Sequence, residues 1–593
     1  MTQSVQRSTT YCFLLALLLL SIAVSAILPP FMSPDENDHI KRAYFLTYGQ
    51  IALTSPSNTN SGGMIDTGLL AYMDATFLKF AKDRSNKVTK EDMAEAGSIR
   101  WTGQDAFSAA PGTGFYFPAL YAPQAIALQI GKALNLSVDH SYRLARFFAL
   151  TASIGLLAAA FSATPPSAIV LAMLLLPMSL FQFASASLDG IAAAMSILAI
   201  SVFLRIARDR DTDWKLLTAL SVSILLVVTC RVHLMPMVLL PFVAFIYTRR
   251  KASLMAGVGI SLIALTWTLF AMKTTIDARV VSDFRPAEIG LYYLLNPLSF
   301  LDIGYRTLSL PGEIWFYYKS YLGLLGWLDV PLTDVVYYTL SAILLAALGL
   351  SLSPRELTSV GWAKAALFLS ALASSFLIFL AMLLTWNKHP AVLIQGVQGR
   401  YFVVPIFLLA YALPTIYGSY TKLRYASTIA LLCCSAAYSS YQTLSVLIEK
   451  YYVADESTPA PSYSMAPTER LTEGNPIHLH FADRQATNPA SIKRIHILIG
   501  TWMQQNPGTA TLTLEGPDGR FETSFDLSSL TDNQYAAFDV PARRYDSGLI
   551  SSDTGQGISL WEARSKDKPS RTCMAYTTET GFTRLQKGCP PIP

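Results

Sequence analysis

The sequence predicts a mainly α-helical protein that crosses a membrane many times and ends in a β-sandwich. Of the 593 residues, 52% are apolar and only 14% are charged, against about 25% charged in an ordinary soluble domain. Apolar runs of about 20 residues, the length that spans a bilayer, recur between residues 11 and 446. After residue 446 these runs stop, and short stretches of alternating apolar and polar residues replace them.

The first apolar run extends from Tyr11 to Leu28, after Arg7 and before Pro29-Pro30. It is long enough to span a membrane, although Val24-Ser25-Ala26 would also suit a signal-peptide cleavage site. We expect an uncleaved anchor because further membrane segments follow, with a removed signal peptide as the alternative. Both interpretations place residue 32 outside the cytoplasm.

Clusters of Lys and Arg predict the orientation, because short cytoplasmic loops collect positive charge. Four clusters lie near residues 205–215, 249–251, 355–364 and 422–424. Placing all four inside, with the N-terminus also inside, requires an even number of crossings before the first cluster. Five apolar runs precede that cluster, so one of them does not cross the membrane. The run at 116–135, which two prolines interrupt, is therefore expected to lie on the outer face of the membrane. About eleven spans result, with the N-terminus in the cytoplasm: 11–31, 144–161, 167–184, 188–204, 216–230, 234–248, 252–272, 335–351, 365–386, 401–418 and 425–446.

The chain is expected to contain three parts. Residues 1–446 form the membrane domain, with two large outer loops at about 32–143 and 273–334. Residues 447–467 form a linker rich in Pro, Ser and Thr. Residues 468–593 show short strand patterns separated by turn residues, which predicts an extracytoplasmic β-sandwich.

The cysteines and the net charge add two expectations. Cys573 and Cys589 lie in the C-terminal domain, where oxidising conditions allow a disulfide between them. The other four cysteines fall in predicted spans and are expected to act as small apolar residues. The net charge of +5 includes no long basic stretch, so nucleic-acid binding is not expected.

The string Ser-Pro-Asp-Glu-Asn-Asp-His at residues 33–39 directly follows the first span. One interpretation is a helix start, with Ser33 as the N-cap, Pro34 in the first helical position and Glu36 closing a capping box. This interpretation accounts for part of the string only, because it leaves the other acidic residues and the histidine unexplained.

Chemistry at the membrane surface is the second interpretation of the same string. Asp35, His39 and Arg42 are spaced so that they share one helix face. In a sugar transfer from a lipid phosphate, a carboxylate would take the proton of the acceptor hydroxyl. Cations or a bound divalent ion would neutralise the phosphate leaving group. Asp35 is the candidate base.

A second polar string, Gln-Gly-Val-Gln-Gly-Arg-Tyr at residues 395–401, precedes the tenth predicted span. Arg400 lies at the outer edge of an apolar helix, where it either extends its charge to the interface or binds phosphate with its planar guanidinium. Charged residues near a bilayer are costly and are therefore functional candidates. Further candidates of this kind are Asp189, Arg231 and Arg143, and the second outer loop adds aromatic residues such as Trp327 that either anchor the chain or stack on sugars.

Four strings together resemble a known bacterial family. They are SPDENDH at 33–39, YFPALYAPQAIAL at 116–128, LGLLGWLD at 322–329 and QGVQGRYFVVP at 395–405. They resemble the membrane proteins catalogued as domain of unknown function 2142, over about residues 11–446. Such proteins look like members of the C superfamily of integral-membrane glycosyltransferases (GT-C), which use polyprenyl-phosphate sugars and carry an acidic motif in the first outer loop. Asp35 and Glu36 match that motif by position.

The resemblance implies an inverting glycosyltransferase in the bacterial cytoplasmic membrane, with a glycan or lipid of the cell envelope as acceptor. Asp35 would be the base, and Glu36 and His39 would assist it or hold a divalent metal ion with it. From their charge rather than from the resemblance, Arg400, Arg143 and Arg42 are expected to bind the donor phosphate. The substrate would also contact Asp189, Tyr401, Arg231 and Trp327. The alternatives are a transporter of lipid-linked sugars and a non-catalytic protein of polysaccharide assembly.

Overall fold

The computed structural model describes residues 3–56, 59–82, 86–279, 284–352, 361–413, 421–453, 464–479, 491–554, 556–565, 568–578, 583–586 and 589–590. The chain divides into two compact units. The first contains Met1–Trp386 and Ile394–Ala454, and the second contains Asn387–Leu393 and Asp455–Pro593.

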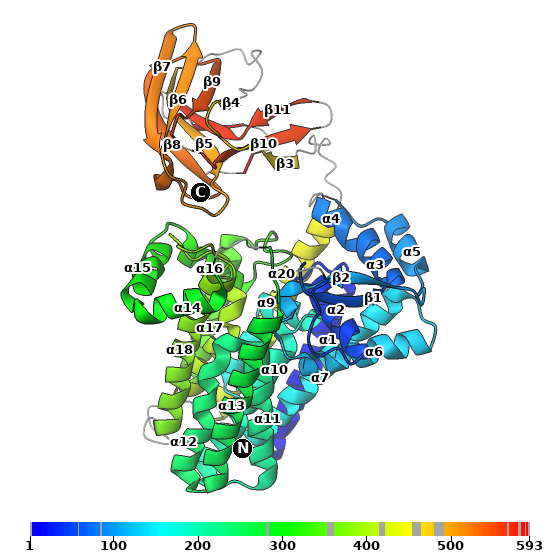
Figure 1. Cartoon of the computed structure of the whole chain (residues 1–593). Coiled ribbons are helices and arrows are strands. Elements are labelled where there is room, and N and C mark those ends of the chain that lie inside the picture. The colour runs from blue at the N-terminus through cyan, green and yellow to red at the C-terminus, as the bar shows by residue number, and fades with distance from the viewer. Residues whose placement is uncertain are drawn as a thin grey trace. The chain divides into compact units, whose positions relative to one another are not determined.

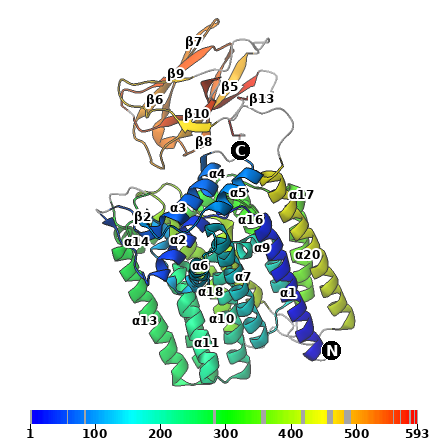
Figure 2. The same cartoon turned by 90° about the vertical axis from the view of Figure 1, so that its right-hand side faces the viewer.

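Within the described residues, seven helices are long and apolar enough to span a membrane. They run side by side in the first unit (Figure 1), and α1 and α20 from its two ends are neighbours (Figure 2). The chain is thus a multi-pass membrane protein. The seven helices are α1 (Gln3–Ile27), α7 (Val138–Ala163), α10 (Asp189–Asp209), α13 (Lys251–Thr274), α17 (Asp334–Ser351), α18 (Gly361–Thr385) and α20 (Lys422–Tyr451).

Shorter apolar helices lie where three more spans are expected. They are α11 (Trp214–Cys230), the pair η5 (Val232–Val238) and α12 (Leu239–Thr248), and the pair η7 (Gly399–Phe402) and α19 (Val403–Ala412). Two predicted segments lie partly outside the described residues. They are the tenth span, at residues 414–418, and the third basic cluster. Helix α20 continues to Tyr451, so the expected linker boundary at residue 447 is several residues too early.

The expected span at 167–184 is interrupted. It forms two short helices, α8 (Ala168–Leu174) and α9 (Pro177–Ala184). The break falls before Pro177, and Leu176 has the extended backbone that a following proline favours. All of α9 is buried, so protein rather than lipid surrounds this broken segment, as the exposed backbone groups of a break require.

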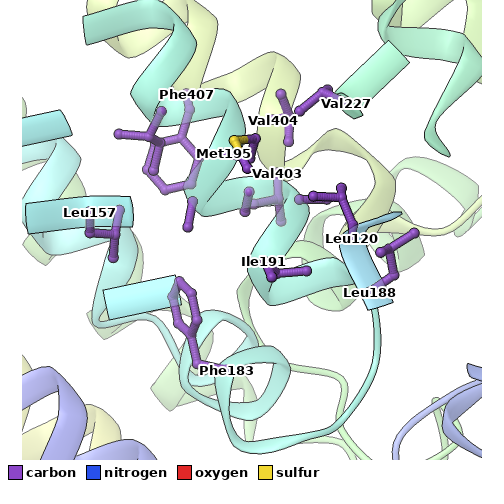
Figure 3. Packing of buried hydrophobic residues seen from close by; sticks show 14 of the residues in the cluster. Leu120, Leu157, Phe183, Leu188, Ile191, Met195, Val227, Val403, Val404 and Phe407 are labelled. Carbon is purple, nitrogen blue, oxygen red and sulfur yellow. The ribbon is translucent and has the colours of Figure 1, made fainter. Parts of the chain in front are cut away.

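Helix α10 lies at the centre of the helical bundle. Of its membrane-length window, 89% is buried, whereas the corresponding share for α13 is 22%. In Figure 3, Ile191 and Met195 of α10 lie among side chains of neighbouring helices, including Val403 and Phe407 of α19. A helix that is apolar on every face belongs in such a core. This packing fixes the N-terminal end of α10, where Asp189 lies.

The first large loop folds against the ends of α1 and α7. Helix α6 has 12 residues, which is too short to cross a bilayer, and it packs on α2 and α7. Strands β1 and β2 form an antiparallel pair. The elements of this loop are α2 (Glu36–Thr47), β1 (Gly62–Asp66), α3 (Thr67–Met73), η2 (Asp74–Leu78), α4 (Lys79–Lys82), α5 (Lys90–Ser98), β2 (Asp105–Ala109), η3 (Pro111–Thr113), η4 (Pro118–Tyr121) and α6 (Ala122–Ala133).

Among its described residues, the second large loop contains three short helices, α14 (Pro286–Leu295), α15 (Pro297–Leu308) and α16 (Glu313–Leu322). Helices α14 and α15 expose several leucines, among them Leu294 and Leu298. Helix α16 packs against the η7 segment that carries Arg400. The loop therefore supports one wall of the site described below.

The second unit is a β-sandwich. One sheet has the order β11-β10-β5-β12-β13, with β3 on β10 and β8 on β5, and the other has the order β4-β9-β6-β7. Alternate residues of both sheets, such as Ile497 and Leu512, share one core. Cys573 and Cys589 form a disulfide. The strands are β3 (Ser464–Pro467), β4 (Ile477–Leu479), β5 (Ile492–Gly500), β6 (Thr509–Gly516), β7 (Gly519–Asp526), β8 (Gln534–Arg543), β9 (Ser547–Ser551), β10 (Ser559–Ser565), β11 (Lys568–Thr572), β12 (Met574–Thr578) and β13 (Thr583–Leu585), with η8 (Leu527–Ser529) between β7 and β8.

Candidate functional site

Four charged residues from distant parts of the chain form one network of ion pairs. Arg400 Nη2 donates to Asp35 Oδ2 at 2.7 Å, although the two residues lie 365 positions apart. Arg400 Nη1 donates to Asp189 Oδ2 at 3.0 Å. Asp189 also pairs with Arg231, at the end of α11. The network thus joins the starts of α2 and α10 to the segments before η5 and α19.

An unusual backbone conformation places Asp35 in this network. Asp35 is the N-cap of α2 with φ 61°, and its side chain makes no capping hydrogen bond. Aspartate tolerates this left-handed region better than most residues. The expected cap at Ser33 is therefore wrong, because the helix begins at Glu36 and the Asp35 carboxylate is bound to Arg400 instead of the helix end.

Arg400 is held firmly by its own segment. Its Nε donates to Gln398 Oε1 at 2.6 Å, and the preceding Gly399 N–H donates to Ser320 Oγ of α16 at 2.7 Å. A Cβ at Gly399 would lie 2.0 Å from the carbonyl oxygen of Tyr317. Only glycine permits this close approach of the two backbones, so Gly399 fixes the place from which Arg400 extends.

A cavity of about 320 Å³ opens beside this network. Its polar part includes Asp35, Arg231 and Tyr401. Its other part is walled by apolar residues near the C-terminal ends of two membrane helices: Ala271 and Met272 of α13, and Ile378, Ala381, Met382 and Leu384 of α18. Polar and apolar groups therefore face the same space, as a ligand with a charged head and an apolar tail requires.

The two carboxyl groups of α2 that line the cavity differ in their environments. Burial raises the pKa of Asp35, but the charge of Arg400 and its hydrogen bond to the carboxylate outweigh burial and hold the pKa below its usual value. Burial and the nearby charge of Asp35 raise the pKa of Asp38, and Lys41 at 3.6 Å offsets only part of this effect. Asp35 is thus ionised and committed to a partner, whereas Asp38 is the more readily protonated group.

His39 lies in the cavity wall as a neutral side chain. Its Nδ1 is 2.7 Å from the hydroxyl oxygen of Tyr121, and its ring stacks near Tyr116. Burial lowers the pKa of His39 to about 4. The imidazole therefore adds no positive charge at neutral pH, and the cations of the ion-pair network are Arg231 and Arg400.

Glu36, expected to be catalytic, does not face the cavity. It is fully buried and accepts hydrogen bonds from Arg146 Nε and Nη2, both at 2.9 Å. It also accepts one from the backbone N–H of Ala186 at 2.7 Å. This side chain joins α2 to α7 and to the segment after α9.

Three further expected residues lie away from the cavity. Arg42 is buried and donates to the carbonyl oxygens of Gln50, Ile51 and Tyr116. Arg143 pairs with Asp139 and is 49% exposed. Trp327 donates from Nε1 to the carbonyl oxygen of Phe31 at 3.0 Å. Their side chains bind these partners and do not line the cavity.

The expected metal site at Asp35, Glu36 and His39 does not fit the geometry. Glu36 is bound to Arg146, Asp35 to Arg400, and His39 to Tyr121. Across the described residues, no group of three or more His, Cys, Asp and Glu side chains is arranged to hold a metal ion. The carboxylates of this string serve ion pairs instead.

Several cavity residues were not expected from the sequence. Tyr116 receives a hydrogen bond from Arg231 Nη1 at 3.2 Å, and Arg279 packs over the ring of Trp386. Asp38 and Gln398 also line the cavity. Tyr116 and Gln398 belong to the two distinctive strings at 116–128 and 395–405, which was the available signal. Arg279 carries no comparable signal.

The fold and this site define a polytopic membrane protein with a charged pocket where the ends of several helices meet. The chain belongs to the family described as predicted membrane protein (DUF2142), whose model matches residues 18–410. The matched region includes every residue of the ion-pair network. No curated protein and no solved structure matches the chain.

Proposed function

We propose that this protein transfers a sugar from a polyprenyl-phosphate donor to a glycan or lipid of the cell envelope, at the outer side of the bacterial cytoplasmic membrane. The observation that carries the proposal is the single cavity in which a carboxylate, a guanidinium and an apolar wall of membrane helices come together. A polyprenyl-phosphate sugar has the matching parts, because it combines a hydroxylated ring, a phosphate and a long apolar chain.

The charged end of the cavity suits the phosphate and the reacting hydroxyl. Arg231 lines the cavity, and Arg400 lies directly behind Asp35. Guanidinium groups stabilise the charge that develops on a phosphate leaving group. A carboxylate within reach of the acceptor hydroxyl serves as a general base. Asp35 is the more accessible carboxylate of the network, since 47% of its side chain is exposed.

In the proposed reaction, the acceptor oxygen attacks the anomeric carbon of the sugar as its proton passes to Asp35. The new carbon–oxygen bond forms as the bond from the anomeric carbon to the phosphate oxygen breaks. The bonding electrons leave with the phosphate, whose added negative charge Arg231 and Arg400 stabilise. Attack opposite to the leaving group inverts the configuration at the anomeric carbon.

Transport of a lipid-linked sugar is the second candidate function, and the broken helix pair α8 and α9 favours it. Transporters bind substrate at such interruptions near the middle of the membrane. In this protein, however, the cavity lies at the helix ends and is not lined by α8 or α9. The position of the cavity therefore supports a reaction at the membrane surface better than passage through the bilayer.

Asp35→Asn tests the proposal, with the full chain reconstituted in liposomes. A panel of synthetic polyprenyl-phosphate hexoses serves as donors and envelope extract as acceptor, and mass spectrometry follows the release of polyprenyl phosphate. We expect the variant to lose about 10²- to 10⁴-fold in rate, the usual contribution of a general base.

The matched control is Asp302→Asn, because Asp302 also forms an ion pair with an arginine but is exposed on α15 and lies outside the cavity. It should transfer sugar as the wild type does. Full transfer by a folded Asp35→Asn protein would remove Asp35 as the base. Movement of the lipid across the bilayer without a new glycosidic bond would favour the transporter.

A further inference from the structure

The two carboxylates that bind Arg400 differ in their access to the cavity. Asp35 is 47% exposed and lines the cavity, whereas Asp189 is 11% exposed and does not line it. The side chain of Arg400 is 4% exposed and does not line this cavity. It lines a separate, smaller cavity together with Asp189. Of the two carboxylates on Arg400, Asp35 is thus the one that faces the open cavity, so an anion in the cavity that binds Arg400 Nη2 takes the place of Asp35.

Asp189, in contrast, is fixed in place. It lies between Arg400 and Arg231 and pairs with both. Arg231 is held in turn by a hydrogen bond to Tyr116 and lies over the ring of that residue. Removing Asp189 would leave two buried cations facing each other, which is a costly arrangement. Of the two carboxylate partners of Arg400, Asp35 is therefore the one that can leave.

The charges of the site support such an exchange. Arg400 and Arg231 carry two positive charges, and Asp189 neutralises one of them. His39 is uncharged, since burial lowers its pKa to about 4. With Asp35 bound the network is neutral, and with Asp35 displaced it carries one net positive charge. A phosphodiester, the form of a lipid-linked sugar donor, carries one negative charge.

We propose that the phosphate of the lipid donor takes the place of Asp35 on Arg400, so that donor binding itself releases the Asp35 carboxylate into the cavity. This inference rests on the proposed function of the cavity. No capping bond within α2 holds the Asp35 side chain, so the ion pair with Arg400 is the contact that has to be exchanged.

The exchange would also activate the base. Burial raises the pKa of Asp35, and attraction to Arg400 is the largest influence that lowers it. A carboxylate that loses Arg400 to the phosphate keeps the effect of burial, so its affinity for a proton increases. Asp35 would then be a weak base in the empty cavity and a stronger base beside a bound donor.

The test measures binding rather than catalysis. Farnesyl methyl phosphate, a phosphodiester with one charge and no sugar, is titrated into the purified full chain in nanodiscs. If Asp35 competes with phosphate for Arg400, then Asp35→Asn binds this probe about three- to fivefold more tightly than the wild type, the gain expected when a partly exposed ion pair no longer competes. Asp35→Ser supplies the same loss of charge should the asparagine variant fold poorly.

Two controls isolate the exchange from general electrostatics. Asp38→Asn removes the same charge from the same cavity, but Asp38 pairs with Lys41 and not with Arg400, so its effect on binding should be smaller. Farnesol, which has the same chain and no phosphate, should bind equally to all three proteins. Unchanged or weaker binding of the phosphodiester to the folded Asp35 variants overturns the inference, as does an equal gain in Asp38→Asn.

The outcomes separate this inference from the proposed function. Tighter binding to Asp35→Asn together with no sugar transfer by the wild type would support the exchange at Arg400 and reject the transferase. Sugar transfer by the wild type together with no gain in binding would support the transferase and reject the exchange.

Discussion

Neighbouring acidic residues at the start of α2 have opposite roles. Asp35 faces the cavity, whereas Glu36 is buried against Arg146. Arg146 also donates to the carbonyl oxygens of Leu28 and Pro29, so one guanidinium ties α2 and α7 to the end of α1. The Glu36 pair is what orients α2 and therefore Asp35.

Glu36→Gln should destabilise the protein, because it leaves the Arg146 charge buried without its carboxylate. Breaking a buried ion pair in this way costs about 3–5 kcal/mol, so the thermal unfolding midpoint in detergent should fall clearly. Glu95→Gln, at an exposed position of α5, should leave the midpoint unchanged. A Glu36→Gln protein with wild-type stability and no sugar transfer would restore the catalytic role that the sequence suggested.

The sequence predicted part of this site for a physical reason. Asp35, Asp189, Arg231 and Arg400 all stand out as charges at the ends of apolar helices, where a charge is costly without a partner. Which side chain faces the cavity was not predictable, because helix spacing assumes that the helix starts at Ser33. The positive φ of Asp35 shifts the start, and it depends on contacts with residues hundreds of positions away.

At the scale of elements, hydropathy predicted where the helices lie better than it predicted whether each helix is continuous. The run at 167–184 is as apolar as a true span, yet it breaks before Pro177 and is surrounded by protein. The strings at 116–128 and 395–405 stand out in the sequence. The packing of Gly399 on α16, however, depends on a helix that lies far from Gly399 in the sequence. Contacts between elements, unlike their composition, are not encoded in local periodicity.

The wall formed by α13 and α18 makes a prediction about the lipid chain. Ala381→Trp in α18 fills the apolar part of the cavity, so transfer from a long-chain polyprenyl donor should fall about tenfold or more, since the displaced chain loses apolar burial worth about 1.5–3 kcal/mol. A donor with a chain of two isoprene units should be affected less. The measurement is the ratio of the two rates.

Leu372→Trp is the matched control for this experiment, because Leu372 lies on the same helix but is exposed on its outer surface. This variant should keep the wild-type ratio of the two rates. An equal loss with long and short donors in Ala381→Trp would show that the apolar wall does not receive the chain.

At the scale of the whole first unit, the element order places the site and the basic loops at opposite ends of the helices. Asp189 begins α10, whereas Arg208 lies in its last turn. Arg249 and Arg250 lie between α12 and α13, and the cavity lies near the other end of α13. Because basic loops stay in the cytoplasm, the cavity is expected to open on the outer side.

Cysteine labelling tests this orientation in cells. Glu95→Cys reports the side of the cavity-bearing loop and Lys251→Cys the side of the basic loops, each in a chain whose Cys12, Cys230, Cys433 and Cys434 are replaced by alanine. Both positions are exposed. A membrane-impermeant maleimide should label residue 95 in intact cells whose outer layers are permeable, and residue 251 only after lysis. The reverse pattern would place Asp35 in the cytoplasm, where an envelope acceptor is absent, and would reject both the orientation and the proposed reaction.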